Sequence, residues 1–154
     1  MTTTSDRELV LSRVFDAPRE LVFRAWTDPR HVAEWWGPNG FTTTLHEMDV
    51  RPGGVWRFVM HGPDGVDYPN LAVFHEVVPP ERLVFTHGSG QAGDAGFEVT
   101  ITFDVVEGGK TRLSLRQLYA TAAERDYVAR EYRAVEMGNQ TLDRFAAYLA
   151  RARV

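Results

Sequence analysis

Apolar and polar residues alternate along much of the chain between residues 41 and 118, which is the pattern of β-strands with one buried face. In residues 97–106 the alternation is clearest, since every odd position is apolar and nearly every even position is polar. Similar runs lie at 7–16, 41–50, 55–61, 66–78, 82–87 and 111–119. Turn sequences such as RPGG, GPDG, PPER and EGGK separate the runs. The pattern therefore predicts one antiparallel sheet of about seven strands joined by hairpins.

Three segments have helical signals instead. DAPRELVFRAW and DPRHVAEWWG each place a proline in a first turn, and in the second Asp28 is an N-cap and Gly37 a stop. Thr121 and Glu124 form a capping box, after which apolar residues recur at helical spacing. We expect one long helix from Thr121 to Arg151, in which Gly138 is the residue that would bend it. The fold class is α+β, with two short helices between the first and second strands and the sheet wrapped around the C-terminal helix.

A curved sheet covered by one long helix is left open at one end, and the two short helices are available to close it. The second of them carries Trp35 and Trp36 side by side. Neighbours on a helix point about 100° apart, so both rings cannot face the same way. We expect one ring to anchor this segment in the core and the other to line the space beneath it; the sequence leaves open which does which.

Composition narrows the class of protein. The 154 residues suit a single domain spanning 1–154, and the net charge of −4 argues against nucleic acid as a partner. The chain has no cysteine, no signal-peptide pattern and no apolar run long enough for a membrane span, so a cytoplasmic location is expected. The five histidines match no metal-ligand spacing, and no nucleophile or phosphate-loop motif is present. We therefore expect no metal, no cofactor and no catalytic residue. We also expect the protein to be a monomer or a homodimer.

Several stretches resemble one family in order and over nearly the whole chain. These are RVFDAPRELVFRAWTDPRHVAEWWGPNGF, MDVRPGGVWRFVMHGPDGVDYPN, VVPPERLVFT, FEVTITFDVV and LDRFAAYLA. They are similar to the START-like (SRPBCC) superfamily, in its bacterial branch homologous to activators of the 90-kDa heat-shock-protein ATPase. The resemblance implies a helix-grip fold that often encloses an apolar pocket. It also makes a chaperone a candidate partner. One departure is that Gly138-Asn139 stands where the family commonly has a Gly-Trp pair.

The resulting functional hypothesis is the binding of a small apolar or amphipathic molecule between the sheet and the C-terminal helix. The alternatives are an enzyme that uses the same pocket for acid–base chemistry, and a module that binds a chaperone or regulator. Glu47 and Asp49 share a strand face and could divide acid and base roles, but we interpret them as a solvated edge, and binding is favoured over catalysis. The candidate ligand-binding residues are Trp35, Trp36, Phe58, Met60, Tyr68, His75, Phe85, His87, Phe97, Met137 and Asn139.

Overall fold

The computed structural model describes residues 5–90, 94, 96–131 and 133–152. Its centre is a seven-stranded antiparallel sheet in the order β1-β7-β6-β5-β4-β3-β2. The strands are β1 (Glu8–Phe15), β2 (Thr42–Met48), β3 (Val55–His61), β4 (Asp67–Val78), β5 (Arg82–Gly88), β6 (Phe97–Val106) and β7 (Lys110–Leu118). Two single 3-10 turns, η1 (Ser5–Arg7) and η2 (Glu107–Gly109), precede β1 and join β6 to β7. The predicted α+β class and strand number are confirmed.

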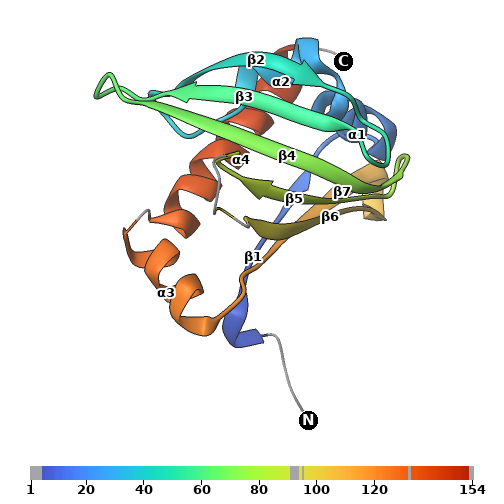
Figure 1. The fold of residues 1–154 in the computed structure, drawn as a ribbon. Coiled ribbons are helices and arrows are strands. Elements are labelled where there is room, and N and C mark those ends of the chain that lie inside the picture. The colour runs from blue at the N-terminus through green and yellow to red at the C-terminus, as the bar shows by residue number, and fades with distance from the viewer. Residues whose placement is uncertain (1–4, 91–93, 95, 132, 153–154) are drawn as a thin grey trace.

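In the described part of the chain, four helices accompany the sheet. They are α1 (Arg19–Thr27), α2 (Pro29–Trp35), α3 (Ala122–Glu131) and α4 (Ala134–Ala152). The sheet curves around α4, while α1 and α2 lie together at one end of the molecule and α3 at the other (Figure 1). This is the helix-grip arrangement that the sequence predicts.

The prediction of one unbroken terminal helix is wrong. The helix ends at Glu131 and a new one begins at Ala134, and Arg133 between them has a positive φ of 51°. A left-handed residue cannot continue a right-handed helix, so the chain changes direction there. Gly138, the expected bend, lies inside α4, where a Cβ would come within 2.4 Å of Leu11 Cδ1. Its lack of a side chain allows α4 to pack closely against β1.

Local sequence signals account for several helix ends. The Asp28 carboxylate accepts a hydrogen bond of 2.9 Å from the backbone N–H of Arg30, and Pro29 is the first residue of α2. The hydroxyl of Thr121 accepts one of 3.0 Å from the Glu124 N–H at the start of α3. Both satisfy backbone donors that a helix leaves unpaired at its first turn.

The face of the sheet that carries the buried apolar residues, here called the inner face, packs against α1, α2 and α4. Cross-strand partners place Phe103 opposite Leu113, and Phe85 opposite Val99 and Phe74. These residues are at most 2% exposed. The alternate residues of the same strands form the outer face, where polar side chains such as Glu98 and Arg112 are exposed.

Candidate functional site

The inner face divides into two halves along the direction of the strands. Nearer α1 and α2 its side chains are fully buried, and we call this region the packed half; it comprises Phe15, Trp56, Phe58, Phe74, Phe85, Val99, Ile101, Phe103 and Leu113. Toward the opposite strand ends the inner-face side chains are only half-buried. This region, the open half, comprises Met60, Asn70, His87, Phe97, Leu115 and Gln117. The surface that these six keep lies on the side of the sheet that α4 crosses.

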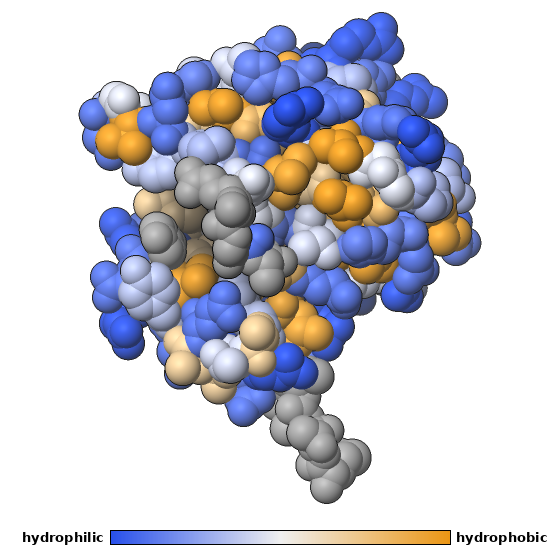
Figure 2. Space-filling view, viewed as in Figure 1, coloured by the Kyte–Doolittle hydropathy of each residue, from blue (hydrophilic) through white to orange (hydrophobic). Residues whose placement is uncertain are grey.

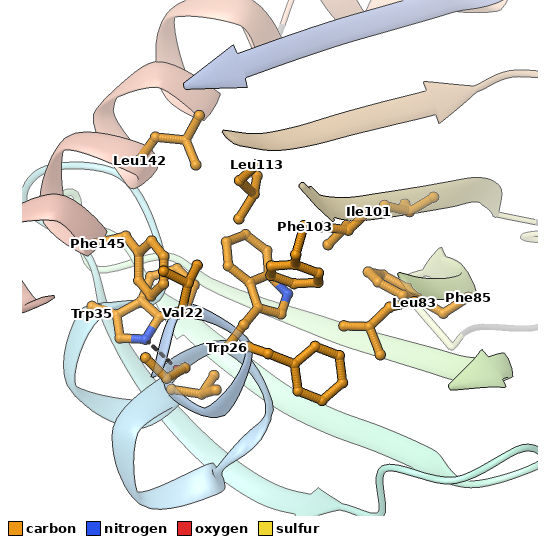
Figure 3. Packing of buried hydrophobic residues seen from close by; sticks show 14 of the residues in the cluster. Val22, Trp26, Trp35, Leu83, Phe85, Ile101, Phe103, Leu113, Leu142 and Phe145 are labelled. Carbon is orange, nitrogen blue, oxygen red and sulfur yellow. Dashed lines mark hydrogen bonds between the residues drawn. The ribbon is translucent and has the colours of Figure 1, made fainter. Parts of the chain in front are cut away.

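Aromatic rings fill the packed half. Phe145 of α4 lies 4.4 Å from Trp35, 5.1 Å from Phe15 and 5.4 Å from Trp26, measured between ring centroids. Figure 3 shows the rings of Phe145, Trp35 and Trp26 converging between α4 and the sheet, with Leu113 above them. This interior holds its own side chains, so the ligand space predicted between sheet and helix does not lie beneath α1 and α2.

The two adjacent tryptophans have different roles. Trp35 is 1% exposed, and its indole N–H donates a hydrogen bond of 3.0 Å to the Ala25 carbonyl, the dashed line in Figure 3. Trp36 is half-buried and turns toward β3, where its ring centroid lies 4.7 Å from Trp56 and 5.8 Å from Phe58. Its indole N–H is buried without a hydrogen-bond partner among the described residues. Trp35 is therefore the anchor, and Trp36 lies at the border with the open half.

The segment after Trp36 is tied to α4 by an arginine that the sequence analysis did not single out. One guanidinium nitrogen of Arg144 donates to the carbonyls of Gly37, Pro38 and Phe41 at 2.8, 2.9 and 3.1 Å. Desolvation by burial lowers the pKa of Arg144 below its ordinary value, with a smaller contribution from Arg151. One turn earlier, the Gln140 side chain accepts from the Asn39 N–H at 3.1 Å. Only the tertiary structure could show these contacts, because they join residues about 100 positions apart.

A polar pair occupies the middle of the open half. His87 Nε2 lies 2.8 Å from Asn70 Oδ1, and the Asn70 amide nitrogen donates to the Tyr68 carbonyl at 2.9 Å. Phe97 and Phe58 lie 5.2 and 5.9 Å from the imidazole between ring centroids. Burial lowers the pKa of His87 from 6.5 to about 4, and the nearby Asp94 carboxylate opposes this only weakly. The imidazole is therefore neutral at neutral pH.

The open half continues to β7. Phe97 stacks on Tyr119 at 4.9 Å, and the Tyr119 hydroxyl donates to Gln117 Oε1 at 2.9 Å. Burial, with a smaller effect of Glu124, raises the pKa of Tyr119 to about 12. Neither Gln117 nor Tyr119 was a sequence candidate. The pairing of β6 with β7 places Gln117 opposite Val99, and the contact of Phe97 with Tyr119 appears only in the tertiary structure.

The other candidates divide among three places. Phe58 and Phe85 belong to the packed half and wall the His87 ring, while Met60 and Phe97 belong to the open half. Tyr68, 39% exposed, pairs with Met60 across β3 and β4 and so lies at the rim. Met137 is half-buried near the start of α4, on the same helical stripe as Arg144.

Asn139 faces β1 and is hydrogen-bonded by protein. Its Oδ1 accepts from an Arg13 guanidinium nitrogen at 3.3 Å, and Arg13 also pairs with Asp143. The polar residue at this helix position is thus matched by an inward-facing arginine on β1.

His75 does not belong to the site, which corrects the sequence-based assignment. The pairing of β4 with β5 shifts between Phe74 and Glu76, so a bulge changes which residues face inward. The exposed His75 lies on the outer face, where its Nε2 is 2.6 Å from the Thr86 hydroxyl. The inward assignment rested on parity with Leu71, Val73 and Val77, but Leu71 and Val73 also face outward, and only Val77, beyond the bulge, faces inward.

A depression of about 600 Å³ is lined mostly by outer-face residues, and its lining also includes Phe58 and Asn70. Its walls include Arg57, Val59 and Leu71, which alternate with the inward-facing Trp56, Phe58 and Ala72. Beside it, Thr44 Oγ1 and Asp67 Oδ1 each lie 2.7 Å from a ring nitrogen of His61. The His61 and Asp67 side chains are 37% and 65% exposed, and we interpret these bonds as links between the ends of β2, β3 and β4. Figure 2 shows small apolar patches among mostly polar side chains on the side turned to the viewer.

Comparison with known proteins identifies a family with this architecture. The family model of Activator of Hsp90 ATPase homolog 1-like protein matches residues 16–150. The chain belongs to this family. The match starts at Asp16, before α1, and includes six of the seven strands and nearly all of α4. The START-like resemblance and the helix-grip fold predicted from the sequence are thereby confirmed, and this fold is consistent with a ligand-binding domain.

Solved structures of other bacterial proteins share the fold. A protein from Nitrosomonas europaea superposes with a TM-score of 0.87 at 24% identity, over 98% of this chain and 99% of that chain. A protein from Chromobacterium violaceum is 30% identical, with a TM-score of 0.77 over 91% and 95% of the two chains. The AHSA1 protein from Silicibacter pomeroyi is 27% identical, with a TM-score of 0.76 over 93% and 97%. No curated protein matches the chain.

Among the residues that the structure describes, no helix is both long and apolar enough to cross a membrane. These residues also contain no group of three or more His, Cys, Asp or Glu side chains placed to hold a metal ion.

Proposed function

We propose that this protein binds a small apolar or amphipathic molecule over the open half, on the side of the sheet that α4 crosses, and we call this proposed site the groove. The observation that supports this most directly is the change in burial along the strands. On β5 and β6 the inner-face residues Phe85 and Val99 are each 2% exposed, whereas their neighbours His87 and Phe97 are half-buried. The sheet therefore presents apolar surface that the protein's own helix does not fully cover.

Apolar contact supplies the driving force for binding. A ligand that buries roughly 200 Å² of apolar surface against Met60 and Phe97 gains about 5 kcal/mol, at about 25 cal/mol per Å², before the costs of association. Met60 suits a ligand wall, because an unbranched thioether adapts to different shapes. The His87–Asn70 pair supplies the small polar contribution that orients a ligand in a mainly apolar site.

Trp36 and the segment tied by Arg144 form one edge of this groove. A Cβ on Gly37 would lie 3.4 Å from the Met60 methyl group, so the segment reaches the open half directly. Since Trp35 fixes the preceding helix in the core, Trp36 contributes to binding through a rigid support.

Native mass spectrometry of gently purified protein, followed by extraction of co-purifying molecules, tests the proposal. Met60→Asp places a charge in the groove, and Val59→Asp is its matched control, because the adjacent residue is equally half-buried on the outer face. We expect a bound small molecule in the wild type and in Val59→Asp, and its loss in Met60→Asp. Equal retention by both variants would move the site away from the open half.

A further inference from the structure

The hydrogen bonds of Asn70 determine which nitrogen of His87 carries the proton. The Asn70 amide nitrogen is engaged with the Tyr68 carbonyl at 2.9 Å, so its Oδ1 is the atom that meets His87 Nε2 at 2.8 Å. An amide oxygen only accepts, and therefore Nε2 is the donor. In the neutral ring the other nitrogen, Nδ1, then carries a lone pair. Within the described part of the chain no group hydrogen-bonds to Nδ1.

The surroundings keep the ring neutral. The rings of Phe97, Phe58 and Phe85 lie within 6.4 Å of the His87 imidazole, measured between ring centroids. The carboxylate that acts on His87 belongs to Asp94, which is itself held by the backbone N–H groups of Ser89 and Gly96 at 2.8 and 2.9 Å. Desolvation is the larger effect and lowers the pKa of His87 to about 4. A neutral acceptor in an apolar setting attracts a donor and offers nothing to an anion.

We propose that the ligand carries a neutral hydroxyl group, which donates its hydrogen bond to Nδ1 of His87 while the apolar body lies over Phe97 and Met60. This inference rests on the proposed function and specifies its ligand class: phenols or apolar alcohols, and not carboxylic acids. A carboxylate in the same place would lose its hydration and face the lone pair of Nδ1. A hydroxyl group only exchanges its hydrogen bond to water for one to Nδ1.

Three naphthalene probes of nearly equal apolar area separate these chemistries: 2-naphthol, 2-methoxynaphthalene and 2-naphthoate. Binding is followed through backbone amide chemical shifts of the full chain. We expect 2-naphthol to bind roughly threefold to tenfold more tightly than 2-methoxynaphthalene, the range for one hydrogen bond, and 2-naphthoate to bind most weakly. His87→Phe should make the first two probes equal, and His75→Phe, the control histidine on the outer face, should leave the ratio unchanged.

Asn70→Asp tests the origin of the preference. A carboxylate next to Nε2 favours the imidazolium, whose Nδ1 then becomes a donor. The order of affinity should invert, with 2-naphthoate preferred over 2-naphthol. Long-range ¹⁵N correlation spectra of the ligand-free wild type provide a reading that needs no ligand, because they distinguish the Nε2–H tautomer from Nδ1–H.

The outcomes separate this inference from the proposed function. Equal binding of all three probes, with shifts confined to the open half, would leave the groove as a binding site and overturn the hydroxyl preference. An Nδ1–H tautomer in the wild type would also overturn it. If none of the probes binds at millimolar concentration, the proposed function fails together with the inference.

Discussion

The packed and open halves are built from the same strands, yet they face different partners. In the packed half, Phe145 of α4 packs against Trp26 and Trp35 of the short helices and against Phe15 of β1. In the open half, the strands continue past α1 and α2 toward the end of the molecule where α3 and the start of α4 lie (Figure 1). There the inner-face residues change from large apolar side chains to a mixture that includes Asn70, His87 and Gln117. One sheet thus provides a tightly packed support at one end and, at the other, the less buried surface on which the proposed binding site lies.

The largest difference between the halves should be the loss of stability when a phenylalanine ring is removed from each. Phe145→Ala deletes a fully buried ring and should lower the free energy of unfolding by about 3–5 kcal/mol. Phe97→Ala removes a half-buried ring and should cost only about 1–2 kcal/mol, because less buried area is lost. Urea unfolding followed by circular dichroism measures both. Equal losses would show that the open half is as tightly packed as the other.

The pH dependence of stability should show the burial of His87. In the unfolded chain the histidine pKa is near 6.5, and in the folded protein it is about 4. Between these values the unfolded state binds a proton that the folded state does not, so the free energy of unfolding falls as the pH drops through this window. The decrease is at most about 3 kcal/mol.

Comparison with His87→Phe isolates this contribution from that of the neighbouring Asp94. Urea midpoints measured from pH 7 to pH 4 should fall less steeply in His87→Phe than in the wild type. His75→Phe removes an exposed histidine and should follow the wild-type curve. A wild-type slope retained by His87→Phe would contradict a neutral, buried imidazole.

The connection between α4 and the segment after Trp36 can be loosened at one residue. Arg144→Ala leaves the carbonyls of Gly37, Pro38 and Phe41 without this donor and should cost about 1–3 kcal/mol. Amide hydrogen exchange near residues 37–43 should become faster while α1 keeps its protection. Arg57→Ala, which removes an exposed pair with Glu47 on the outer face, is the control and should change neither. Uniformly faster exchange would mean that Arg144 supports the whole fold.

The smallest expected change in the free energy of unfolding distinguishes the two adjacent tryptophans. Trp35→Phe removes a buried indole and its 3.0 Å hydrogen bond to Ala25, at a cost of about 2 kcal/mol. Trp36→Phe removes a half-buried ring whose N–H has no partner among the described residues, at a cost of about 1 kcal/mol or less. Binding of 2-naphthol should respond in the opposite order, with the larger loss in Trp36→Phe. Titration and thermal unfolding of the two variants check both orders.

Several features were predictable because they depend on neighbours in the sequence. Period-two alternation identified the inner face of β6, and Asp28 and Thr121 marked the starts of two helices through hydrogen bonds within one turn. The positions of Phe58, Met60, Phe85, His87 and Phe97 on the inner face followed from parity along uninterrupted strands. These properties need no knowledge of how the elements pack.

Predictions failed where parity was tied to the wrong partners or where the backbone left a regular helix. His75 shares parity with Leu71 and Val73, which lie on the outer face, and only Val77, beyond the bulge in β4, faces inward. The left-handed Arg133 interrupts the terminal helix at a residue type that ordinarily favours helices.

The sequence by itself determined the fold class, the strands, the capped helix starts and the family, since these follow from periodicity and short-range hydrogen bonds. Tertiary structure alone decided that Trp35 anchors while Trp36 borders the groove, that Arg144 ties the intervening segment to α4, and that Asn70 orients His87. Each of these is a contact between residues that are far apart in the chain or on different elements. Its geometry depends on how the sheet curves around the helix, and no local pattern of residues encodes that curvature.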